Sequence, residues 1–592
     1  MSGYAAPLAE MRFALDEIAG LPEIAKLPGY ETTSPDVVDA VLGEAAKLAG
    51  NVIAPTNQTG DIEKSRLENG VVRTPAGFKE AYRAYAGGGW SALSASPEHG
   101  GQGLPIALDT AVNEMWMSAN FAWSLCPMLS ISAWELLEQL GTPAQQRLYL
   151  GRLISGEWTG TMNLTEPQAG SDLSALRTRA VREGDHYRIA GQKIFITWGE
   201  HDMAGNIVHL VLARLPDAPA GTKGISLFVV PKFLVNDDGS LGARNDLRCV
   251  SLEHKLGIHA SPTCVMSYGD DGGAIGTLVG EENRGLEAMF IMMNVARLHV
   301  GLQGVAIGER AYQQARTYAR ARIQGKPAGA KDGAGLPIVH HPDVRRMLLS
   351  MRAASEASRA LAYYVAGETD RARRLPDTAQ RARARAQARL DLLTPVVKAW
   401  CTDQGVETAS TGIQVHGGMG FIEETGAAQH WRDARIAPIY EGTNGIQAND
   451  LVGRKLLRDD GAAAADLVVE MRRALTQLDS HDADGHLAQG IDALECATKG
   501  LLTSAANDLS AALAGAEPYL RLLGTVAAGW LLARGAAAAT RRLKAGAGDR
   551  PFLEAKIATA RFYAEHRLAQ APALLPAIAG GRTVMGFDLD LI

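Results

Sequence analysis

The stretch Ile207-Val208-His209-Leu210-Val211-Leu212-Ala213 is an almost uninterrupted run of β-branched and aliphatic residues. Apolar runs of about four to eight residues, bounded by turn formers, are typical of buried strands. Similar short runs lie close by, at 187–189, 193–197 and 225–231, and clusters of Gly, Asp and Pro separate them. The sequence therefore predicts a small β-barrel or sandwich in this part of the chain.

Helical periodicity flanks the β-rich region on both sides. Residues 36–155 place apolar side chains at helical spacing, with Gly and Pro turns between the segments. Helical patterning returns after about Gly285 and continues to about Leu457. After the turn Asp459-Asp460-Gly461 the chain is again helical and rich in Ala and Leu. The predicted order is helices, strands, helices and then more helices.

Length and composition restrict the class of protein. A chain of 592 residues is too long for one core and suggests roughly three to five packing units. Its 59 basic and 65 acidic residues give a net charge of −6, which argues against a general polyanion binder. The five cysteines form no CxxC pair, so we expect a reducing compartment, no disulfide framework and no metal site.

The N-terminus and the apolar stretches bear on localisation. Glu10, Asp16 and Glu17 lie among the first apolar residues, and no basic region precedes an apolar core. Neither a signal peptide nor an organelle transit sequence is therefore expected. Arg or Asp interrupts the Ala/Leu-rich stretches, so we expect no run that spans a bilayer. These features predict a soluble, cytoplasmic protein.

Arginines are concentrated between Arg371 and Arg389, where they alternate with Ala and Gln. Nucleic-acid-binding segments usually add aromatic side chains on which bases stack, and this stretch has none. We therefore interpret it as a solvated helix face or an interhelix loop rather than as a nucleic-acid site.

The segment Ile439-Tyr440-Glu441-Gly442-Thr443 sets one carboxylate between an aromatic residue and a glycine. Glycine allows the backbone to approach a ligand closely, and an aromatic neighbour helps to exclude water. A carboxylate held in this way has a raised pKa and can act as a general base. Because Glu-Gly is also common in ordinary loops, the segment alone leaves both interpretations open.

Three further clusters also allow both a functional and a purely structural interpretation. Thr165-Glu166-Pro167-Gln168-Ala169-Gly170-Ser171-Asp172 is either a hydrogen-bonding cradle or an ordinary turn. Phe195-Ile196-Thr197-Trp198-Gly199 either places an aromatic ring and a hydroxyl against a planar cofactor or ends a core strand. The glycines of Gln414-Val415-His416-Gly417-Gly418-Met419-Gly420-Phe421 either approach a pyrophosphate or simply end a helix. His416 is better interpreted as a packed or exposed histidine than as a catalytic one.

These four clusters, in this order and on this helix–strand–helix layout, resemble the acyl-CoA dehydrogenase family from about residue 40 to about residue 457. Three supporting segments also look like family turns and strands: Ser96-Pro97-Glu98-His99-Gly100-Gly101-Gln102-Gly103-Leu104, Gly191-Gln192-Lys193 and Gly280-Glu281-Glu282-Asn283-Arg284-Gly285. So many ordered segments do not match by chance.

The resemblance implies an α+β multidomain fold with an N-terminal helical domain, a middle β-barrel or sandwich domain, a C-terminal four-helix bundle and an additional C-terminal helical domain. The expected boundaries are an N-terminal extension at 1–40, the N-terminal helical domain at 41–158, the middle β-domain at 159–281, the helical bundle with the catalytic Glu at 282–460 and the additional helical domain at 461–592.

The activity that the resemblance implies is FAD-dependent desaturation of an acyl-CoA to a trans-2,3-enoyl-CoA. A thioester acidifies its α-proton, which still needs a base of raised pKa, and the flavin accepts the β-hydride. Glu441 matches the family's base, and its own backbone N–H is expected to polarise the thioester carbonyl. Electrons are then expected to pass to an electron-transferring flavoprotein, as in the β-oxidation of fatty acids.

The resemblance also assigns cofactor and substrate contacts position by position. Residues expected along the flavin ring and ribityl chain are Met162, Leu164, Thr165, Gly170, Ser171, Phe195 and Thr197. Residues expected to reach the FAD of a neighbouring subunit are Arg322, Gln414, Gly417 and Gly418, which predicts a homodimer. Thr443 and Asn444 are expected at the adenine or pyrophosphate end. The expected substrate contacts are Ser171, Asn294, Arg297 and Gly442.

Two positions depart from the family pattern. Phe195 stands where many relatives have Trp; it keeps the stacking surface but loses the indole donor. Asn444-Gly445 follows Thr443 where many relatives read Ser-Gln, so the polar contact there is in doubt.

The extension after residue 461, together with Met11-Arg12-Phe13-Ala14-Leu15, resembles a longer branch of the family. That branch includes 3-methylthiopropanoyl-CoA dehydrogenases, which implies a short or thioether-bearing acyl-CoA as substrate. Residues 461–592 contain 13 Lys or Arg and 14 Asp or Glu, so the extension is not a basic clamp for DNA or a membrane. We expect it to pack over the catalytic body in place of a second dimer interface.

Two alternatives remain open from the sequence. An acyl-CoA oxidase would keep the fold but pass electrons directly to O₂. A flavin-bearing, DNA-binding protein of the alkylation-response type also resembles this family. The near-neutral extension and the intact Glu441 count against the second alternative.

Overall fold

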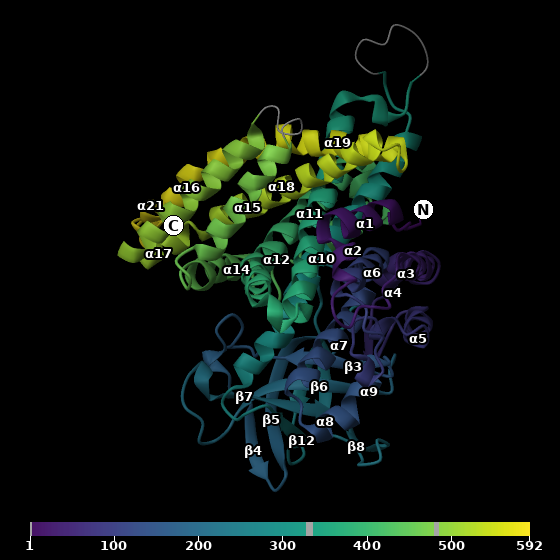
Figure 1. Ribbon diagram of the computed structural model, residues 1–592. Helices are drawn as coiled ribbons and strands as arrows, with labels where there is room; N and C mark the ends of the chain where they lie inside the picture. Colours follow the sequence, from purple (N-terminus) through teal and green to yellow (C-terminus); the bar gives the residue numbers. More distant parts are fainter. Residues whose placement is uncertain (1–2, 327–334, 479–484, 592) are drawn as a thin grey trace. The chain divides into compact units, whose positions relative to one another are not determined.

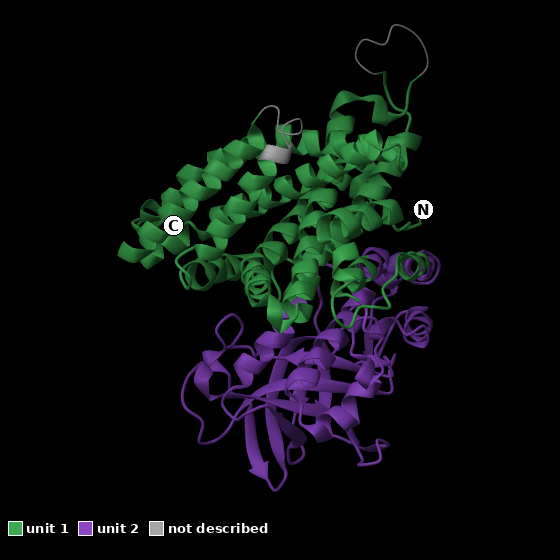
Figure 2. Cartoon of the chain, viewed as in Figure 1, with its two compact units in different colours: residues 1–43, 105–114, 297–592 green, residues 44–104, 115–296 purple. Residues whose placement is uncertain are grey.

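The computed structural model describes residues 3–326, 335–478 and 485–591. The chain divides into two compact units, which Figure 2 shows in different colours. Unit 1 comprises Met1–Gly43, Pro105–Glu114 and Arg297–Ile592. Unit 2 comprises Glu44–Leu104 and Met115–Ala296.

An eight-stranded sheet forms the centre of unit 2 (Figure 1). Its strand order is β10-β11-β5-β12-β7-β6-β3, and β4 pairs with β5 and β6. β3 runs parallel to β6, whereas β5, β7, β11 and β12 pair antiparallel with their neighbours. The strands are β3 (Trp158–Asn163), β4 (Arg179–Glu183), β5 (His186–Thr197), β6 (Asn206–Arg214), β7 (Ile225–Pro231), β10 (Leu247–Leu252), β11 (Thr263–Tyr268) and β12 (Ala274–Val279).

The apolar sequence runs become the central strands of this sheet. Every residue of β3 and β7, and all but the last residue of β6, is buried. The predicted strands at 187–189 and 193–197 form a single strand, β5, because Gly191 and Gln192 between them stay paired with β11, and a bulge at residues 194–195 bends the second run. Two small hairpins accompany the sheet: β1 (Arg66–Glu68) with β2 (Val71–Arg73), and β8 (Phe233–Val235) with β9 (Leu241–Arg244). The first hairpin interrupts a region expected to be helical throughout.

The helices that precede the sheet in the sequence are mostly short. They are α3 (Pro35–Leu48), α4 (Thr56–Glu63), α5 (Phe78–Gly87), α6 (Ile106–Ala119), α7 (Phe121–Leu140), α8 (Pro143–Gln145) and α9 (Gly151–Ile154). α7 packs on β3 within unit 2. Every residue of α7 from Phe121 to Leu137 is buried, so the protein covers this part of the helix on all sides.

Long helices form the body of unit 1. The first are α10 (Gly285–Ala321), α11 (Pro342–Arg374) and α12 (Gln380–His416), followed by α13 (Ala427–Ala434) and α14 (Asn444–Asp450). The N-terminal segment adds α1 (Leu8–Ala14), the π-helix η1 (Leu15–Ala19) and α2 (Leu21–Ile24). α11 and α12 pack along each other, and η1 packs on α11.

The C-terminal extension is entirely helical where it is described. Its helices are α15 (Ala462–Leu478), α16 (His486–Asn507), α17 (Leu509–Ala514), α18 (Ala516–Lys544), α19 (Arg550–His566), α20 (Leu575–Ala579) and α21 (Gly581–Met585). α18 packs on α11, α12 and α14, and α19 packs on α11. The extension thus lies against the helical body of unit 1, as expected.

A buried ionic cluster joins the two ends of the chain to α11. Lys556 Nζ of α19 lies 2.7 Å from a carboxylate oxygen of Glu10 in α1 and 2.7 Å from one of Glu356 in α11. All three side chains are almost completely buried. Burial raises the pKa of Glu10, whereas Lys556 and Arg352 hold the pKa of Glu356 below its usual value against the effect of burial.

A second buried cluster centres on Arg359 in α11. Its guanidinium lies 2.6 Å from Glu114 and 3.0 Å from Glu309. The hydroxyl of Tyr363 donates a hydrogen bond of 2.8 Å to Glu114. Because buried charges are stable only when they are paired, this cluster fixes α6, α10 and α11 in register.

Two helices pass a length and hydropathy test for membrane spans, contrary to the expectation that none would do so. They are Gly285–Ala321 and Ala516–Lys544, whose most apolar windows have mean hydropathies of 1.3 and 1.4. In the most apolar 18-residue segment of each helix, 72% is buried inside the protein for Gly285–Ala321 and 83% for Ala516–Lys544. Such burial is typical of core helices, whose apolar surface is covered by protein.

The predicted fold class is confirmed: helices precede a β-rich middle region, and two successive helical regions follow it (Figure 1). The residue limits expected for the individual domains stay predictions.

Candidate active site

Glu441 lies in a strained turn between α13 and α14. Its φ angle is +55° and that of Gly442 is +82°, so two consecutive residues adopt the left-handed conformation. This conformation is unfavourable for a residue with a side chain and is often retained at functional sites. The hydroxyl of Thr443 then caps α14 by accepting a hydrogen bond of 3.2 Å from the Ile446 N–H.

The Glu441 carboxyl is half-buried, and two buried cations act on it electrostatically. Burial raises its pKa, and the charges of Lys398 and Arg297 oppose that rise without cancelling it. Lys398 is completely buried in α12, and burial lowers its pKa to about 7. A carboxyl of raised pKa that is not sealed from solvent has the properties of a general base.

Asn444 anchors the turn to α12. Its side-chain N–H₂ donates to the Ala399 carbonyl at 3.1 Å and to Asp403 at 2.8 Å, and its Oδ1 accepts from Lys398 Nζ at 2.9 Å. This amide is therefore fully used within the protein. The cofactor contact expected of Asn444 stays a prediction beside this internal anchoring role.

Two more residues hold the turn from its other side. Gln447 Nε2 donates to the carbonyls of Glu441 and Gly442, at 3.3 Å each. A Cβ atom at Gly442 would come within 2.7 Å of that nitrogen, which explains the glycine. Arg297 is 4% exposed and forms an ion pair of 3.2 Å with Asp450. Its position is therefore next to the turn rather than on an open surface.

The backbone N–H of Glu441 donates to no acceptor within the described part of the chain. Backbone amides away from water normally find a partner, so a free N–H beside the half-buried Glu441 carboxyl is a donor for a ligand. Tyr440 stabilises the same turn through a hydrogen bond from its hydroxyl to the buried Gln303.

In unit 2, the predicted cradle at 165–172 is held by an internal ion pair. Glu166 is buried and lies 2.9 Å from Lys193 Nζ of β5. It also accepts hydrogen bonds from the backbone N–H groups of Arg177 and Thr178. Burial opposes the charge of Glu166, but Lys193 and these donors outweigh it and lower its pKa to about 2. The cradle is therefore a fixed loop.

Phe195 projects from β5 at a β-bulge. The pairing register with β11 shifts between Cys264 and Met266, where one residue of β11 opposes two of β5. Phe195 has a φ of +60°, and its side chain is 57% exposed. A large aromatic ring held outward by a strained backbone, instead of being packed in the core, is a surface for a flat ligand.

The neighbouring residues offer polar groups to the same kind of ligand. The hydroxyls of Thr165, Ser171 and Thr197 make no hydrogen bond with any other described residue. Gly170 is exposed, and a Cβ atom there would meet nothing within 4 Å. Of the remaining predicted residues, Met162 is buried in β3 and Leu164 follows that strand, half-buried. Free hydroxyls beside an exposed ring fit a ligand with a ring and a polar chain.

Four family models together match most of the chain. Their descriptions and matched residues are the acyl-CoA dehydrogenase N-terminal domain at 39–157, middle domain at 161–270 and C-terminal domain at 283–456, and the acetyl-CoA dehydrogenase C-terminal-like domain at 467–588. The chain is 50% identical to 3-methylmercaptopropionyl-CoA dehydrogenase of Ruegeria pomeroyi over 96% of this chain and 97% of that protein. The chain belongs to the acyl-CoA dehydrogenase family.

Two further similarities extend over almost the whole chain. A broad-specificity linear acyl-CoA dehydrogenase of Mycobacterium tuberculosis, FadE5, is 34% identical over 96% of each chain. The crystal structure of an acyl-CoA dehydrogenase complexed with FAD from Bacillus anthracis has the same fold, with a TM-score of 0.73 at 19% identity, and covers 98% of this chain and 92% of that one.

This acyl-CoA dehydrogenase is accordingly an FAD-dependent oxidoreductase. The residues present fit that cofactor. The exposed Phe195 ring suits a flavin face, and the free hydroxyls of Thr165, Ser171 and Thr197 suit its polar edge and ribityl chain.

The glycine-rich turn that ends α12 is open in the acyl-CoA dehydrogenase. Gln414, Gly417 and Gly418 are exposed, Gly417 has a φ of +60°, and a Cβ atom at Gly418 would meet nothing within 4 Å. His416, by contrast, is buried and stacks on Tyr318 at 4.4 Å. The interpretation of His416 as a packed histidine agrees with this geometry.

Two other predicted residues are exposed. Arg322 follows the last residue of α10 and forms no ion pair with the rest of the described chain. Asn294 lies on the exposed side of the same helix, in the part that belongs to unit 2.

Sequence reasoning missed the residues that support Glu441, namely Lys398, Gln303, Gln447 and Asp450. One signal was readable for Lys398, which is a lone cation in the apolar helical run Thr394-Pro395-Val396-Val397-Lys398-Ala399-Trp400. A buried lysine has to find a partner, so a charge on an otherwise apolar helix face points to a site.

Proposed function

We propose that this acyl-CoA dehydrogenase oxidises a short or thioether-bearing acyl-CoA, such as 3-methylthiopropanoyl-CoA, to the trans-2,3-enoyl-CoA, with Glu441 as the base. The observation that carries the proposal is the strained, half-buried Glu441 turn, in which burial raises the carboxyl pKa beside a free backbone N–H. The substrate class is supported by the relative of 50% identity, whose name gives the same thioester under its older chemical name.

Each residue of the Glu441 turn has a separate role in the proposed reaction. The Glu441 carboxylate takes the α-proton of the thioester, which becomes acidic when the carbonyl is polarised. The Glu441 N–H donates to that carbonyl oxygen and stabilises the negative charge that develops there. Gly442 lets the backbone approach the substrate, while Asn444 and Gln447 keep the turn in its strained form. Arg297 and Lys398 limit the rise in the Glu441 pKa.

FAD, when bound, accepts the β-hydride. We assign the flavin and ribityl contacts to Met162, Leu164, Thr165, Gly170, Ser171, Phe195 and Thr197, and the adenine or pyrophosphate end to Thr443 and Asn444. We assign CoA contacts to Ser171, Asn294, Arg297 and Gly442. The strongest support for the flavin contacts is the outward Phe195 ring with its free hydroxyl neighbours.

We also propose a homodimer in which Arg322, Gln414, Gly417 and Gly418 contact the FAD of the neighbouring subunit. An apolar group beside the glycine-rich turn supports this proposal: Met419 is 46% exposed, Phe421 86% and Ile422 46%. Exposed apolar side chains in a cluster usually mark an interface. Sedimentation of the holoenzyme tests the proposal, and a monomer with one FAD per chain would refute it.

The proposed electron acceptor is an electron-transferring flavoprotein, and the proposed compartment is the cytoplasm. The relatives' names, which are those of dehydrogenases, support a protein acceptor over O₂. Peroxide formed in step with enoyl-CoA in air would instead favour an oxidase. The balanced charges of the C-terminal extension count against the DNA-binding alternative.

A substrate screen tests the proposed specificity. The holoenzyme is mixed anaerobically with 3-methylthiopropanoyl-CoA, butyryl-CoA and octanoyl-CoA, and flavin bleaching is followed by stopped flow. We expect kcat/KM for the thioether substrate to exceed that for octanoyl-CoA by roughly tenfold or more, since each misfitted methylene changes binding by about 1 kcal/mol. Fastest bleaching by octanoyl-CoA would overturn the short-chain assignment but not the reaction class.

Replacement of Lys398 with Met is expected to move the acidic limb of the pH profile of flavin bleaching to higher pH. The Lys398 cation lowers the pKa of Glu441, so its removal leaves more of the base protonated at a given pH. The pKa of Lys398 is lowered to about 7, so the difference from the natural enzyme should be largest below that pH and shrink above it.

Two results separate this electrostatic role from a purely structural one. Lys398→Arg, which keeps the charge, should retain the natural position of the acidic limb. A uniform fall in rate for Lys398→Met, with the midpoint of the profile unchanged, would show that Lys398 only holds Asn444 in place.

A further inference from the structure

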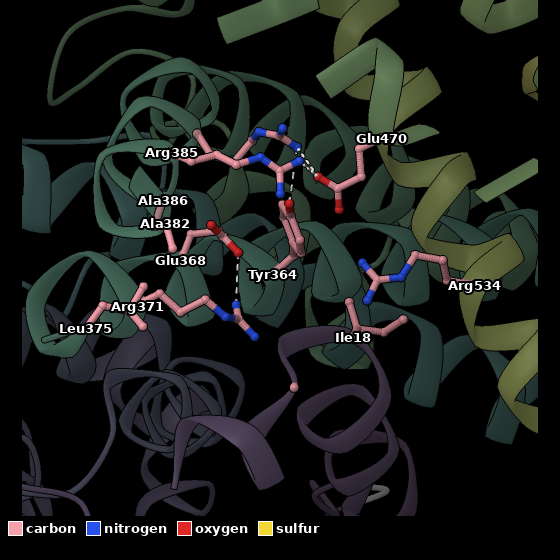
Figure 3. A pocket seen from close by; sticks show the side chains of 12 residues that line it. Ile18, Tyr364, Glu368, Arg371, Leu375, Ala382, Arg385, Ala386, Glu470 and Arg534 are labelled. Atoms are coloured by element: carbon pink, nitrogen blue, oxygen red, sulfur yellow. Dashed lines mark hydrogen bonds and ion pairs between the residues drawn. The ribbon is translucent and has the colours of Figure 1, made fainter. Parts of the chain in front are cut away.

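A cavity of about 280 Å³ lies within unit 1, where η1, α11, α12, α15 and α18 meet (Figure 3). It shares no residue with the Glu441 turn. The N-terminal segment and the C-terminal extension supply part of its wall, so the cavity belongs to the long form of this enzyme. Its apolar lining includes Ile18, Leu375 and Ala382.

Four arginines line this cavity against two glutamates: Arg371, Arg385, Arg389, Arg534, Glu368 and Glu470. Three of the arginines belong to the basic stretch that the sequence suggested was a solvated face or a loop. That interpretation holds for the short connection between α11 and α12 but is wrong for Arg389, whose side chain is only 2% exposed.

Three of the four guanidinium groups have carboxylate partners. Arg371 pairs with Glu368 at 2.9 Å. Arg385 and Arg389 share Glu470, at 2.8 Å and 3.1 Å, and both also pair with Asp466 next to the cavity. Figure 3 shows the Glu368–Arg371 pair on one side of Tyr364 and Arg534 on the other.

Arg534 is the exception, because it forms no ion pair among the described residues and feels the charges of Glu470 and Glu368 only from a distance. Its guanidinium lies over the rings of Trp530 and Tyr364, at 5.1 Å and 5.9 Å, and makes one long hydrogen bond of 3.5 Å to the Glu17 carbonyl. Burial lowers its pKa, which shows that the surroundings disfavour the charge. Arg534 is half-buried, and most of its guanidinium donors make no hydrogen bond with the described residues, so they are free for an acceptor in the cavity.

The size of the cavity limits what such an acceptor can be. One water takes about 30 Å³ of liquid volume, so the cavity holds the equivalent of about nine waters. That is at the lower end of the range for small-molecule sites, which begins at about 300 Å³. A guanidinium fork fits the two oxygens of a carboxylate or phosphate, and an aliphatic wall fits a short hydrocarbon portion.

We propose that this cavity binds a small organic anion, through one carboxylate or phosphate group on Arg534 and a short apolar portion on the aliphatic wall. Arg371 and Arg385 add positive potential around the anion. The bound anion neutralises the charge of Arg534 and connects the N-terminal segment, α11 and α18. The site is therefore a candidate position for an effector that acts on the terminal extensions rather than on the base.

Isothermal titration of the holoenzyme at constant ionic strength tests this proposal. The probes are inorganic phosphate and butyrate, with butanol as the uncharged control. We expect one saturable site per chain for at least one of the two anions and none for butanol. The stronger of the two anions identifies the oxyanion group that the site prefers.

Variants locate the binding site. Arg534→Gln should weaken binding at least tenfold, whereas Arg541→Gln, a change at an exposed arginine on the same helix, should leave it within twofold. Arg385→Gln, at a half-exposed wall residue, should weaken binding about threefold and serves if the first variant does not fold. Anions bound at any other place are insensitive to Arg534→Gln, so only the difference between variants counts.

Two results would overturn the proposal. One is that neither phosphate nor butyrate binds saturably to the natural holoenzyme. The other is that folded Arg534→Gln, or folded Arg385→Gln in its place, binds the anion as tightly as the natural protein does. Both readouts are independent of acyl-CoA turnover, so they remain valid whatever the substrate of the enzyme is.

Discussion

Replacement of Glu441 with Gln should leave FAD bound but reduce the rate of flavin bleaching by acyl-CoA by roughly 10²–10⁴-fold. Gln keeps the size of the side chain and removes only its ability to accept a proton. The turn should persist, because the contacts that hold it come from Asn444, Gln447 and Thr443 and none uses the Glu441 carboxylate. Stopped-flow bleaching under anaerobic conditions measures the loss.

The flavin spectrum and an exposed glutamate provide the controls. An unchanged flavin spectrum and an FAD content of one per chain would show that the site is intact. Glu281→Gln, a change at an exposed glutamate outside the turn, should bleach at the natural rate. Bleaching by Glu441→Gln at an undiminished rate would remove Glu441 from the role of base.

Replacement of Arg359 with Met should have the largest effect on stability. The Arg359 side chain is completely buried between Glu114 and Glu309, and its removal leaves two carboxylates without their cation. Breaking a buried pair from one side destabilises by about 3–5 kcal/mol. Urea unfolding followed by helix ellipticity should show an earlier loss of the helical signal.

The matched control is Arg383→Met, since Arg383 forms an exposed pair with Asp377. Exposed pairs contribute about 0–1 kcal/mol, so this variant should unfold close to the natural enzyme. Combining Arg359→Met with Glu114→Leu should recover part of the lost stability, because one of the two stranded charges disappears. Equal stability of Arg359→Met and Arg383→Met would contradict the structural account.

The middle sheet shows how far sequence patterns reach. The run at 225–231 predicts β7 to the residue, since a continuous apolar stretch bounded by turns has few other interpretations. β3 (Trp158–Asn163) was not identified, because Thr, Gly and Asn interrupt its apolar pattern although all its residues are buried. The bulge in β5 could not be predicted from the sequence either, because it depends on how β11 pairs with β5.

The site was predictable where a single segment carries the chemistry. The Glu441 turn and the segments that contain Thr165 and Phe195 stand out from local residue types. The residues that support the Glu441 turn did not, because Lys398 and Gln303 come from helices α12 and α10, far away in the sequence. Asn444 illustrates the same limit: its residue type suggests a ligand contact, and only the fold reveals that α12 uses the whole amide.

The cluster of Lys556, Glu10 and Glu356 has a consequence for how such enzymes can be shortened or recombined. The lysine comes from the C-terminal extension and one of its two acids from the first helix, so each end of the chain neutralises the other. Removal of only the N-terminal residues would leave the buried Lys556 ammonium without Glu10, one of its two partners. Removal of only the extension would leave the carboxylates of Glu10 and Glu356 close together without the lysine between them. Chimaeras with the shorter members of the family should therefore exchange the N-terminal segment and the C-terminal extension together.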